Sequence, residues 1–418
     1  MAQASSSNLI RVARRAADRL RAGHLWVYRT DIEGAVETLE AGALVTVVDG
    51  RGLPLGSALY SDTSQIAARV VSREAGMTRE KYLEDLRSKL EAALARRRVL
   101  APVNAGDNAH RLIFSEADGL PGIIADRYND LVLLQLLTQG TAQDDVRAVV
   151  VDALRDEFAG AALTLWERPD PRIRELEQLA EPAEGPLFAS GEAKTTTEFA
   201  LNGLRFEYDA GAGQKTGAFL DQRLNYAAAA RWVEASGRVG KALDVCTYQG
   251  GFALHLARVC ERVTGVDASR AALEAADRNL ERNPQLRAKT DWIEADAFEL
   301  LRAFDDAART NAAGKFDAIV LDPPAFAKSK RAAEGAMRGY KELNLRALRL
   351  LNPGGTLVTC SCSHHVSLGD FTDVVAAAAN DAGRRVQLLE TRAAAPDHPE
   401  VLSLPETRYL KCLILRVD

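Results

Sequence analysis

Cysteine is scarce in this chain, with five among 418 residues. Their number is odd and no Cys-x-x-Cys pair occurs, which argues against a disulfide framework and against a structural zinc site. Uninterrupted apolar runs of the ~20 residues that cross a bilayer are also missing. The first residues, Met-Ala-Gln-Ala-Ser-Ser-Ser, have neither the charged start nor the apolar stretch of a secretory signal. We therefore expect a soluble, cytoplasmic protein with free thiols, no metal site and no membrane partner.

An excess of basic charge is absent too, because 53 lysine and arginine residues face 58 aspartate and glutamate residues and the net charge is −5. The average gives no support to nucleic-acid binding, but the basic residues are clustered. The clusters comprise Arg11, Arg14, Arg15, Arg19 and Arg21, then residues 96–98, then Lys328, Lys330 and Arg331. Solvated helix faces explain the first two clusters equally well. The third adjoins residues 322–326, Asp-Pro-Pro-Ala-Phe, which we expect to carry chemistry.

The length is typical of two or three domains, and residues 1–75 predict a small β-barrel. Apolar runs at 44–48, 53–60 and 66–71 are separated by turn residues, and Asp49-Gly50 between the first two is a strong hairpin signal. Gly23, His24 and Trp26 precede them. A Trp beside arginines can stack on an unpaired nucleotide, but it can equally fill a small core, so the residues alone leave RNA contact open.

Residues 76–195 predict an α+β connector domain. Apolar residues at helical spacing mark 82–99 as a helix, two apolar runs at 122–125 and 131–137 indicate strands, and a second helix is expected at 142–158. The segment 181–186, Glu-Pro-Ala-Glu-Gly-Pro, is the best candidate for a linker between domains.

From residue 196 to 418, strands alternate with helices, which predicts a doubly wound parallel sheet of about seven strands. Acidic residues accompany successive strands: Asp244, Asp267, Asp296 and Asp322. Such carboxylates suit an adenosine cofactor, with one acid on the ribose hydroxyls. The loop at 247–251, Thr-Tyr-Gln-Gly-Gly, is not a full G-x-G-x-x-G, so a nicotinamide cofactor is disfavoured.

S-adenosylmethionine, which has no phosphate, fits this pattern better. We expect Asp244 near its cationic methionine end, Asp267 on the ribose and Asp296 at the adenine amine. Each acid alone would be equally consistent with a helix cap.

At these residues the chain resembles the class I S-adenosylmethionine-dependent methyltransferases, and more narrowly the bacterial large-subunit ribosomal RNA cytosine carbon-5 methyltransferases with an amino-terminal PUA domain. The resemblance spans nearly the whole chain. Its motifs are residues 213–223, Gly-Gln-Lys-Thr-Gly-Ala-Phe-Leu-Asp-Gln-Arg, then 248–252, 322–326 and 361–363, with 23–27 and Asp49-Gly50 similar to the PUA module. It implies a Rossmann-like seven-stranded methyltransferase sheet after a PUA-type β-barrel and the α+β domain.

The resemblance and the acid series together predict the site. Cofactor contacts are expected from Lys215, Thr216, Phe219, Asp221, Asp244, Tyr248, Gly250, Phe252, Asp267, Asp296, Ala297 and Asp322. RNA contacts are expected from Gly23, His24, Trp26, Pro323, Phe326 and Lys328. The expected partner is large-subunit ribosomal RNA, and a homodimer is compatible with the sequence.

The chemistry implied is covalent. Carbon 5 of cytosine is too weak a nucleophile to attack a sulfonium methyl, so a thiolate first adds to carbon 6. Cys362 is the expected nucleophile, and Asp322 is expected to bind the edge of the base while Phe326 stacks on its ring. Cys360 lies on the same face of the strand and is the alternative. Where many cytosine methyltransferases have a second cysteine, this chain has Pro323-Pro324. The base that removes the carbon-5 proton is not identified.

Two other functions stay open. An Asp-Pro-Pro-aromatic loop also suits methylation of a base nitrogen, which needs no cysteine. A ribosome-assembly protein that binds RNA through its barrel without methyl transfer is the second.

Overall fold

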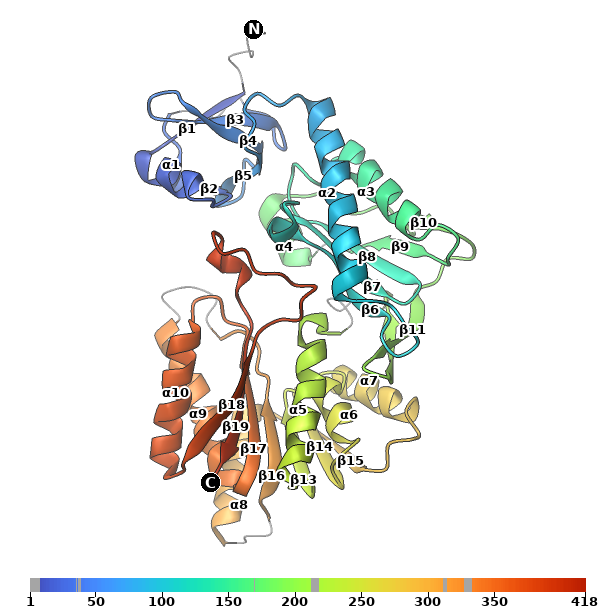
Figure 1. Ribbon diagram of the computed structural model, residues 1–418, viewed down its shortest axis with the longest axis vertical. Coiled ribbons are helices and arrows are strands. Elements are labelled where there is room, and N and C mark those ends of the chain that lie inside the picture. Colours follow the sequence, from blue (N-terminus) through green and yellow to red (C-terminus); the bar gives the residue numbers. More distant parts are fainter. Residues whose placement is uncertain are drawn as a thin grey trace.

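The computed structural model describes residues 8–34, 36, 39–168, 170–211, 218–310, 314–326 and 333–418. Three parts are visible in Figure 1: a small barrel-like sheet at the top, a second sheet flanked by long helices beside it, and a seven-stranded sheet below. None of the described helices is long and apolar enough to cross a membrane.

The first part is a five-stranded sheet with strand order β1-β3-β4-β5-β2 and one short helix. Its elements are β1 (Leu9–Val12), α1 (Arg14–Arg21), β2 (Trp26–Tyr28), β3 (Leu44–Asp49), β4 (Pro54–Tyr60) and β5 (Ile66–Ser72). The predicted hairpin between β3 and β4 is confirmed. Asp49 Oδ1 accepts hydrogen bonds from the backbone N–H groups of Arg51 and Leu53, both at 2.9 Å, and Gly52 supplies the left-handed φ of +82°.

The second part is a five-stranded sheet with order β10-β9-β8-β7-β6. It comprises α2 (Arg79–Leu100), β6 (Ala109–Phe114), β7 (Ile123–Tyr128), β8 (Leu131–Leu136), α3 (Asp144–Glu157), β9 (Thr164–Glu167), α4 (Pro171–Glu177) and β10 (Phe188–Ala189). The helices and strands expected here are confirmed. The expected linker at 181–186 is wrong, because β10 follows it and still pairs with β9. Proline and glycine mark a loop within this sheet rather than a boundary.

A two-stranded hairpin, β11 (Thr196–Leu201) and β12 (Leu204–Asp209), leads into the seven-stranded sheet. That sheet has order β15-β14-β13-β16-β17-β19-β18. Its strands are β13 (Lys241–Val245), β14 (Arg262–Asp267), β15 (Lys289–Glu294), β16 (Phe316–Leu321), β17 (Leu351–Ser361), β18 (Val386–Arg392) and β19 (Lys411–Val417). Neighbours among β13 to β17 pair in parallel, whereas β19 is antiparallel to both β17 and β18.

Helices cover both faces of this sheet. On one face are α5 (Arg223–Ser236), α6 (Gly251–Leu256) and α7 (Arg270–Glu281), and on the other α8 (Ala297–Thr310), α9 (Ala333–Leu350) and α10 (Leu368–Ala382). The near-continuous apolar strands follow from this double burial, since each residue of a strand meets one of the two cores. The carboxyl ends of the parallel strands therefore meet at one edge, where open sheets of this kind bind their ligands.

The connection between β18 and β19, residues 393–410, is termed the bridging segment. It rises from the seven-stranded sheet toward the other two parts (Figure 1). Asp397 in its middle is buried and accepts hydrogen bonds from the Arg223 guanidinium at 3.0 Å and from the Arg111 backbone N–H at 2.8 Å. Near its tip, the Ser403 hydroxyl donates to the Gly23 carbonyl at 3.0 Å. One segment thus contacts all three parts.

Candidate active site

Asp244 lies on β13 at the centre of the carboxyl edge and is fully buried. Its Oδ2 accepts hydrogen bonds from the Thr247 hydroxyl at 2.5 Å and the Ala253 backbone N–H at 2.8 Å. Its Oδ1 is buried without a hydrogen-bond partner among the described residues. Burial raises the pKa of this carboxyl group to about 7, although the two hydrogen bonds favour the ionised form. A buried acceptor with nothing to bind is costly, and it fits a cationic or N–H-bearing ligand.

The loop after β13 folds tightly enough to bring backbone against a ligand. Cys246 and Tyr248 both adopt left-handed backbone conformations, with φ of 64° and 51°, and Gly250 follows with φ of 85°. A Cβ on Gly250 would also approach the Trp292 ring at 3.3 Å. Non-glycine residues in this region cost conformational energy and cluster at functional sites.

Asp267, at the end of β14, is held by this same loop. Its Oδ2 accepts from the Tyr248 backbone N–H and its Oδ1 from the Ser269 backbone N–H, both at 2.9 Å. Each carboxylate oxygen retains lone pairs, so Asp267 is oriented and still able to accept hydroxyl groups.

A hollow opens beside this loop. Aromatic, small and polar residues line it, among them Ala218, Phe219, Tyr226, Cys246, Thr247, Tyr248, Gln249, Gly251, Phe252 and Asp322. The Phe219 and Tyr248 rings face each other at its rim with centroids 5.0 Å apart, and Phe219 is 49% exposed. Phe252 is buried at its base against Tyr226. The predicted cofactor residues Phe219, Tyr248, Phe252 and Asp322 are therefore brought together.

Asp296 and Ala297 lie at the start of α8, farther along the edge. Asp296 is exposed, and its Oδ1 accepts from the backbone N–H groups of Phe298 at 2.9 Å and Glu299 at 3.1 Å. Asp296 therefore caps α8, which is one of the two roles that the sequence allowed for this acid. Its contact with a cofactor stays a prediction. Lys215 and Thr216 lie outside the described residues.

Asp322 follows β16 and is half-buried, at the end of a chain of polar side chains whose other members are buried. Its Oδ1 accepts from the Gln222 side-chain amide at 3.0 Å, and Gln222 in turn accepts from the Asn225 amide at 2.6 Å. Burial, with the charges of Asp221 and Asp244, raises the pKa of Asp322 to about 8. At neutral pH this group is largely a carboxylic acid, which can donate a hydrogen bond as well as accept one.

Asp221 precedes Gln222 of this hydrogen-bonded chain, and its own hydrogen bonds fix its orientation. The Tyr409 hydroxyl donates to its Oδ2 at 2.6 Å, and its backbone carbonyl accepts from the Ala395 N–H at 2.8 Å. Both partners belong to the bridging segment, so that segment reaches the candidate site directly.

Cys362 comes directly after β17, and its Sγ lies 3.9 Å from the Pro323 carbonyl oxygen. Its neighbours Ser361 and Ser363 both hydrogen-bond the Tyr340 hydroxyl, at 3.0 and 2.9 Å, which fixes the strand end on α9. Burial raises the pKa of the thiol to about 12, with Asp322 and Asp221 adding to the effect and Lys411 opposing it. The thiol is therefore protonated at neutral pH in the ligand-free protein.

Cys360 differs from Cys362 in its surroundings. It is fully buried in the sheet and directly opposite Cys412 on β19. Cys362 is partly exposed and faces the Asp-Pro-Pro loop. Only the second of these thiols has access to a ligand at the edge of the sheet.

The remaining residues of the loop are only partly available. Pro323 is buried, and Phe326 packs against Tyr340 and Phe298 with ring centroids 4.8 and 5.8 Å apart. Phe326 is half-buried, so part of its surface remains for a base. Lys328 lies outside the described residues.

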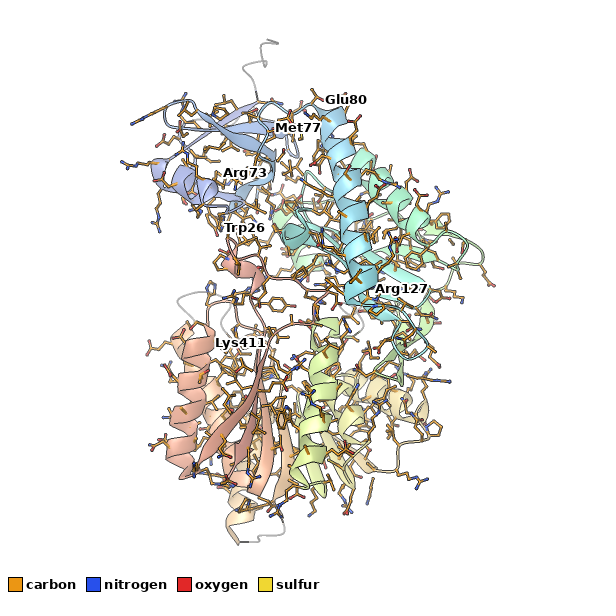
Figure 2. All side chains as sticks on the ribbon, viewed as in Figure 1. Trp26, Arg73, Met77, Glu80, Arg127 and Lys411 are labelled. Atoms are coloured by element: carbon orange, nitrogen blue, oxygen red, sulfur yellow. The ribbon has the colours of Figure 1, made fainter. Side chains whose placement is uncertain are left out.

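The three barrel residues expected on RNA make contacts within the chain. Ser403 covers Gly23, His24 is buried with its Nε2 3.5 Å from Glu406 Oε1, and the Trp26 indole N–H donates to Glu116 at 2.9 Å. Figure 2 shows Trp26 on the side of the barrel that faces the bridging segment and the second sheet. Direct contact of these residues with RNA stays a prediction.

Sequence reasoning missed several residues of the site. Gln222, Asn225, Tyr340 and Lys411 are all buried there. Gln222 falls in the motif at 213–223 and could have been found as a polar residue beside Asp221. For Lys411 the only signal was a charge opening the apolar strand Lys-Cys-Leu-Ile-Leu.

Comparison with protein families decides the class. A family model described as S-adenosylmethionine-dependent methyltransferase matches residues 120–416, and one described as PUA-like domain matches residues 10–73. The chain belongs to the S-adenosylmethionine-dependent methyltransferase family. The cofactor expected from the acids is thereby confirmed, and so is a PUA-like domain at the amino terminus.

Named relatives cover nearly the whole of this methyltransferase. It is 37% identical over 396 residues to the ribosomal RNA large subunit methyltransferase I of Klebsiella pneumoniae strain 342, covering 94% of each chain. The protein of the same name from Pseudoalteromonas translucida is 37% identical, with 95% of this chain and 96% of the relative covered.

Solved structures agree on the fold. A candidate methyltransferase crystallised with SAH superimposes with a TM-score of 0.80 at 19% identity, over 98% of this chain and 100% of the other. A candidate SAM-dependent methyltransferase from Streptococcus mutans gives 0.78 at 18% identity with the same coverage.

Proposed function

We propose that this methyltransferase transfers a methyl group from S-adenosylmethionine to carbon 5 of a cytosine in large-subunit ribosomal RNA, through a covalent adduct with Cys362. The carrying observation is the placement of a partly exposed cysteine at the end of β17, against the Asp-Pro-Pro loop and next to the cofactor hollow. The named relatives, which are ribosomal RNA large subunit methyltransferases, support the substrate.

The cofactor supplies an electrophilic methyl group on a sulfonium. The residues at this edge fit it: Asp244 Oδ1, which has no hydrogen-bond partner among the described residues, suits the cationic methionine end, Asp267 is oriented to accept ribose hydroxyls, and the Phe219 ring at the rim of the hollow offers an apolar face. Asp296 is proposed for the adenine amine, with its second oxygen, since Oδ1 caps α8.

The reaction that these residues support begins at Cys362. Its thiolate forms a bond to carbon 6 of the ring, and a proton on Asp322 can neutralise the developing charge at the base edge, because the carboxyl group is still protonated near neutral pH. Carbon 5 thereby becomes nucleophilic and takes the methyl group, while the sulfur–methyl bond breaks and leaves a neutral thioether. Loss of the carbon-5 proton to a base then expels the Cys362 thiolate and restores the aromatic ring.

We further propose that the parts of the chain divide the work, with boundaries at about 1–75, 76–195 and 196–418 for the PUA-like, α+β and methyltransferase domains. The barrel would bind RNA, and the seven-stranded domain would hold the cofactor and the flipped base. The three sheets and the hairpin fall within these ranges.

The test is the identity of the product. The purified chain is incubated with unmodified large-subunit ribosomal RNA and methyl-labelled S-adenosylmethionine, and the RNA is digested to nucleosides for mass spectrometry. Label in 5-methylcytidine is expected. Label in a nitrogen-methylated nucleoside would overturn the carbon-5 assignment, and no transfer despite cofactor binding would favour the non-catalytic alternative.

A further inference from the structure

Lys411 is a buried cation at the carboxyl edge of the sheet. Its residue is 4% exposed, and its ammonium donates to two backbone carbonyls, Ser363 at 2.7 Å and Tyr409 at 2.8 Å. Figure 2 places it at the end of the sheet that faces the bridging segment. Ser363 is the residue directly after Cys362, so the charge is held one peptide from the candidate nucleophile.

No carboxylate compensates this charge within the part of the chain that the structure describes. The two carbonyl groups satisfy two of its three N–H donors, but neither carries a formal charge. Burial lowers the pKa of Lys411 to about 8, and the Cys362 thiolate favours the protonated lysine. A buried cation without an anionic partner is destabilising unless some state of the protein supplies the anion.

The charged groups around Cys362 indicate that its thiolate is the anion that pairs with Lys411. The charges of Asp322, Asp221 and Lys411 all act on the Cys362 thiol, Tyr340 on α9 also interacts with it, and His364 lies two residues along the same chain. The ammonium of Lys411 is hydrogen-bonded to the carbonyl of Ser363, the next residue after Cys362. The two carboxyl groups oppose a thiolate, and the lysine supports one. Of the described residues named here, Lys411 alone brings a full positive charge.

The backbone fixes this relationship. Lys411 pairs with Ser361 in the antiparallel register of β19 and β17, so it is level with the last residue of the strand that ends before Cys362. Because Ser361 and Ser363 are also hydrogen-bonded to the Tyr340 hydroxyl, the strand end cannot move away from the lysine without breaking these hydrogen bonds.

We propose that Lys411 is a positioning residue whose charge stabilises the Cys362 thiolate and whose hydrogen bond to Ser363 fixes the strand end that carries it. The inference rests on the proposed function for its purpose, since a thiolate is needed only if Cys362 is a nucleophile. Lys411 itself touches neither the base nor the methyl donor. The thiol loses its proton to water before the attack, and the sulfur leaves the adduct again as a thiolate, so Lys411 transfers no proton in either step.

The experiment measures the Cys362 thiolate without RNA or cofactor. The full chain is treated with iodoacetamide across a pH series, and alkylation of the Cys362 peptide is followed by mass spectrometry. Lys411→Gln keeps amide donors for the two carbonyls but removes the charge, Lys411→Met removes both, and Lys411→Arg keeps the charge. Lys289→Met, an exposed lysine at the start of β15, is the matched control.

At a fixed pH near 7, below the pKa of Lys411, alkylation of Cys362 is expected to slow about tenfold in the Gln and Met variants, the change that a one-unit rise in thiol pKa produces. Lys411→Arg should recover at least part of the rate and Lys289→Met should match the wild type. Unchanged alkylation in a folded Gln or Met variant would overturn the proposal. Failure of both variants to fold, as judged by thermal unfolding, would also overturn it by giving Lys411 a structural role.

The outcome is separable from that of the proposed function. If the wild type makes no 5-methylcytidine but the Gln variant still slows alkylation, the carbon-5 assignment fails while the charge coupling stands. If 5-methylcytidine is made and alkylation is insensitive to Lys411, the carbon-5 assignment stands while the charge coupling fails.

Discussion

Two sets of buried charges in this protein are treated in opposite ways. Around the second sheet and the bridging segment, buried carboxylates meet arginines: Asp118 with Arg97, Asp126 with Arg111, Glu177 with Arg69 and Asp397 with Arg223. At the carboxyl edge of the seven-stranded sheet, Asp244 and Lys411 are buried and Asp322 is half-buried, and none of the three has an oppositely charged partner among the residues that the structure describes.

The paired charges hold the parts of the fold together, whereas the unpaired charges lie at the candidate active site. A buried ion pair with complete hydrogen bonding fixes how two parts of a chain sit, and burial of Asp397 is outweighed by His398 and Arg223, which hold its pKa well below the usual range. Unpaired charges shift the other way, and the pKa of Asp244 and of Asp322 is raised. Their missing partners are what a cationic cofactor and a nucleotide base would supply.

The largest effect is expected from the nucleophile. Cys362→Ala should lower methyl transfer by about a thousandfold or more, because Cys362 is the thiol that lies against the Asp-Pro-Pro loop. Cys246 is also partly exposed, but it follows β13 and lines the cofactor hollow. Cys360→Ala is the matched control, two residues away and fully buried. It should cost stability through a small cavity while leaving most of the activity. Single-turnover transfer of labelled methyl groups measures both, and equal losses in the two variants would contradict the assignment.

Mutation of a buried carboxylate–arginine pair should lower the free energy of unfolding. Asp397→Asn leaves the Arg223 guanidinium buried without its counter-charge, and we expect the free energy of unfolding to fall by about 3–5 kcal/mol. Asp244→Asn makes the sharper comparison, since burial raises the pKa of this carboxyl group to about 7 and so already disfavours its charged form. It should change stability by less than about 1 kcal/mol and instead weaken cofactor binding. Urea unfolding and calorimetric titration with S-adenosylmethionine report the two quantities, and a reversal of the pattern would erase the distinction.

The smallest expected effect is a pH dependence at the site. The pKa of Asp244 is raised to about 7 and that of Asp322 to about 8, so the folded protein binds these protons more tightly than the unfolded chain. Their contribution to stability is complete below the unfolded pKa near 4 and is lost as pH rises through 7 and 8. Buried His110 acts oppositely only at lower pH, because its pKa is lowered to about 4.

Stability of the cofactor-free protein should therefore fall between pH 6.5 and 8, by up to about 1 kcal/mol per pH unit for each group. Asp244→Asn should flatten this decline. The affinity for the cationic cofactor should move the other way, rising up to tenfold between pH 6 and 7 as Asp244 ionises. Thermal unfolding and calorimetry over this range are the measurements, and a wild type with the same slope as the Asn variant would show that Asp244 does not titrate there.

The parts of the fold set by local pattern could be predicted from the sequence. The β3–β4 hairpin follows from Asp49-Gly50, and the alternation of apolar strands with amphipathic helices gave the parallel sheet and put Asp244, Asp267 and Asp322 along one edge. Strands β6 and β9 were not predicted, because polar residues interrupt their apolar pattern, as in Ala-His-Arg-Leu-Ile-Phe.

Features that depend on distant partners could not be read in this way. The partners of Asp397 are 174 and 286 positions away in the sequence, and Lys411 meets the Ser363 carbonyl 48 positions back. The prediction of a linker at 181–186 was wrong for a related reason. Proline and glycine show that the chain turns, but they do not show which sheet it returns to.

The central claim is that the sulfur of Cys362 becomes bonded to the ring of a cytosine. Ribosomal RNA carrying 5-fluorocytidine tests it most directly, because fluorine at carbon 5 cannot leave as a proton and the adduct should persist after methyl transfer. Incubation with the chain and S-adenosylmethionine, followed by nuclease and protease digestion and mass spectrometry, should yield a nucleotide on the peptide that contains Cys362. The account predicts that the mass is lost in Cys362→Ala. A nucleotide on Cys360 alone, or none on any cysteine while unsubstituted RNA is methylated at carbon 5, would contradict it.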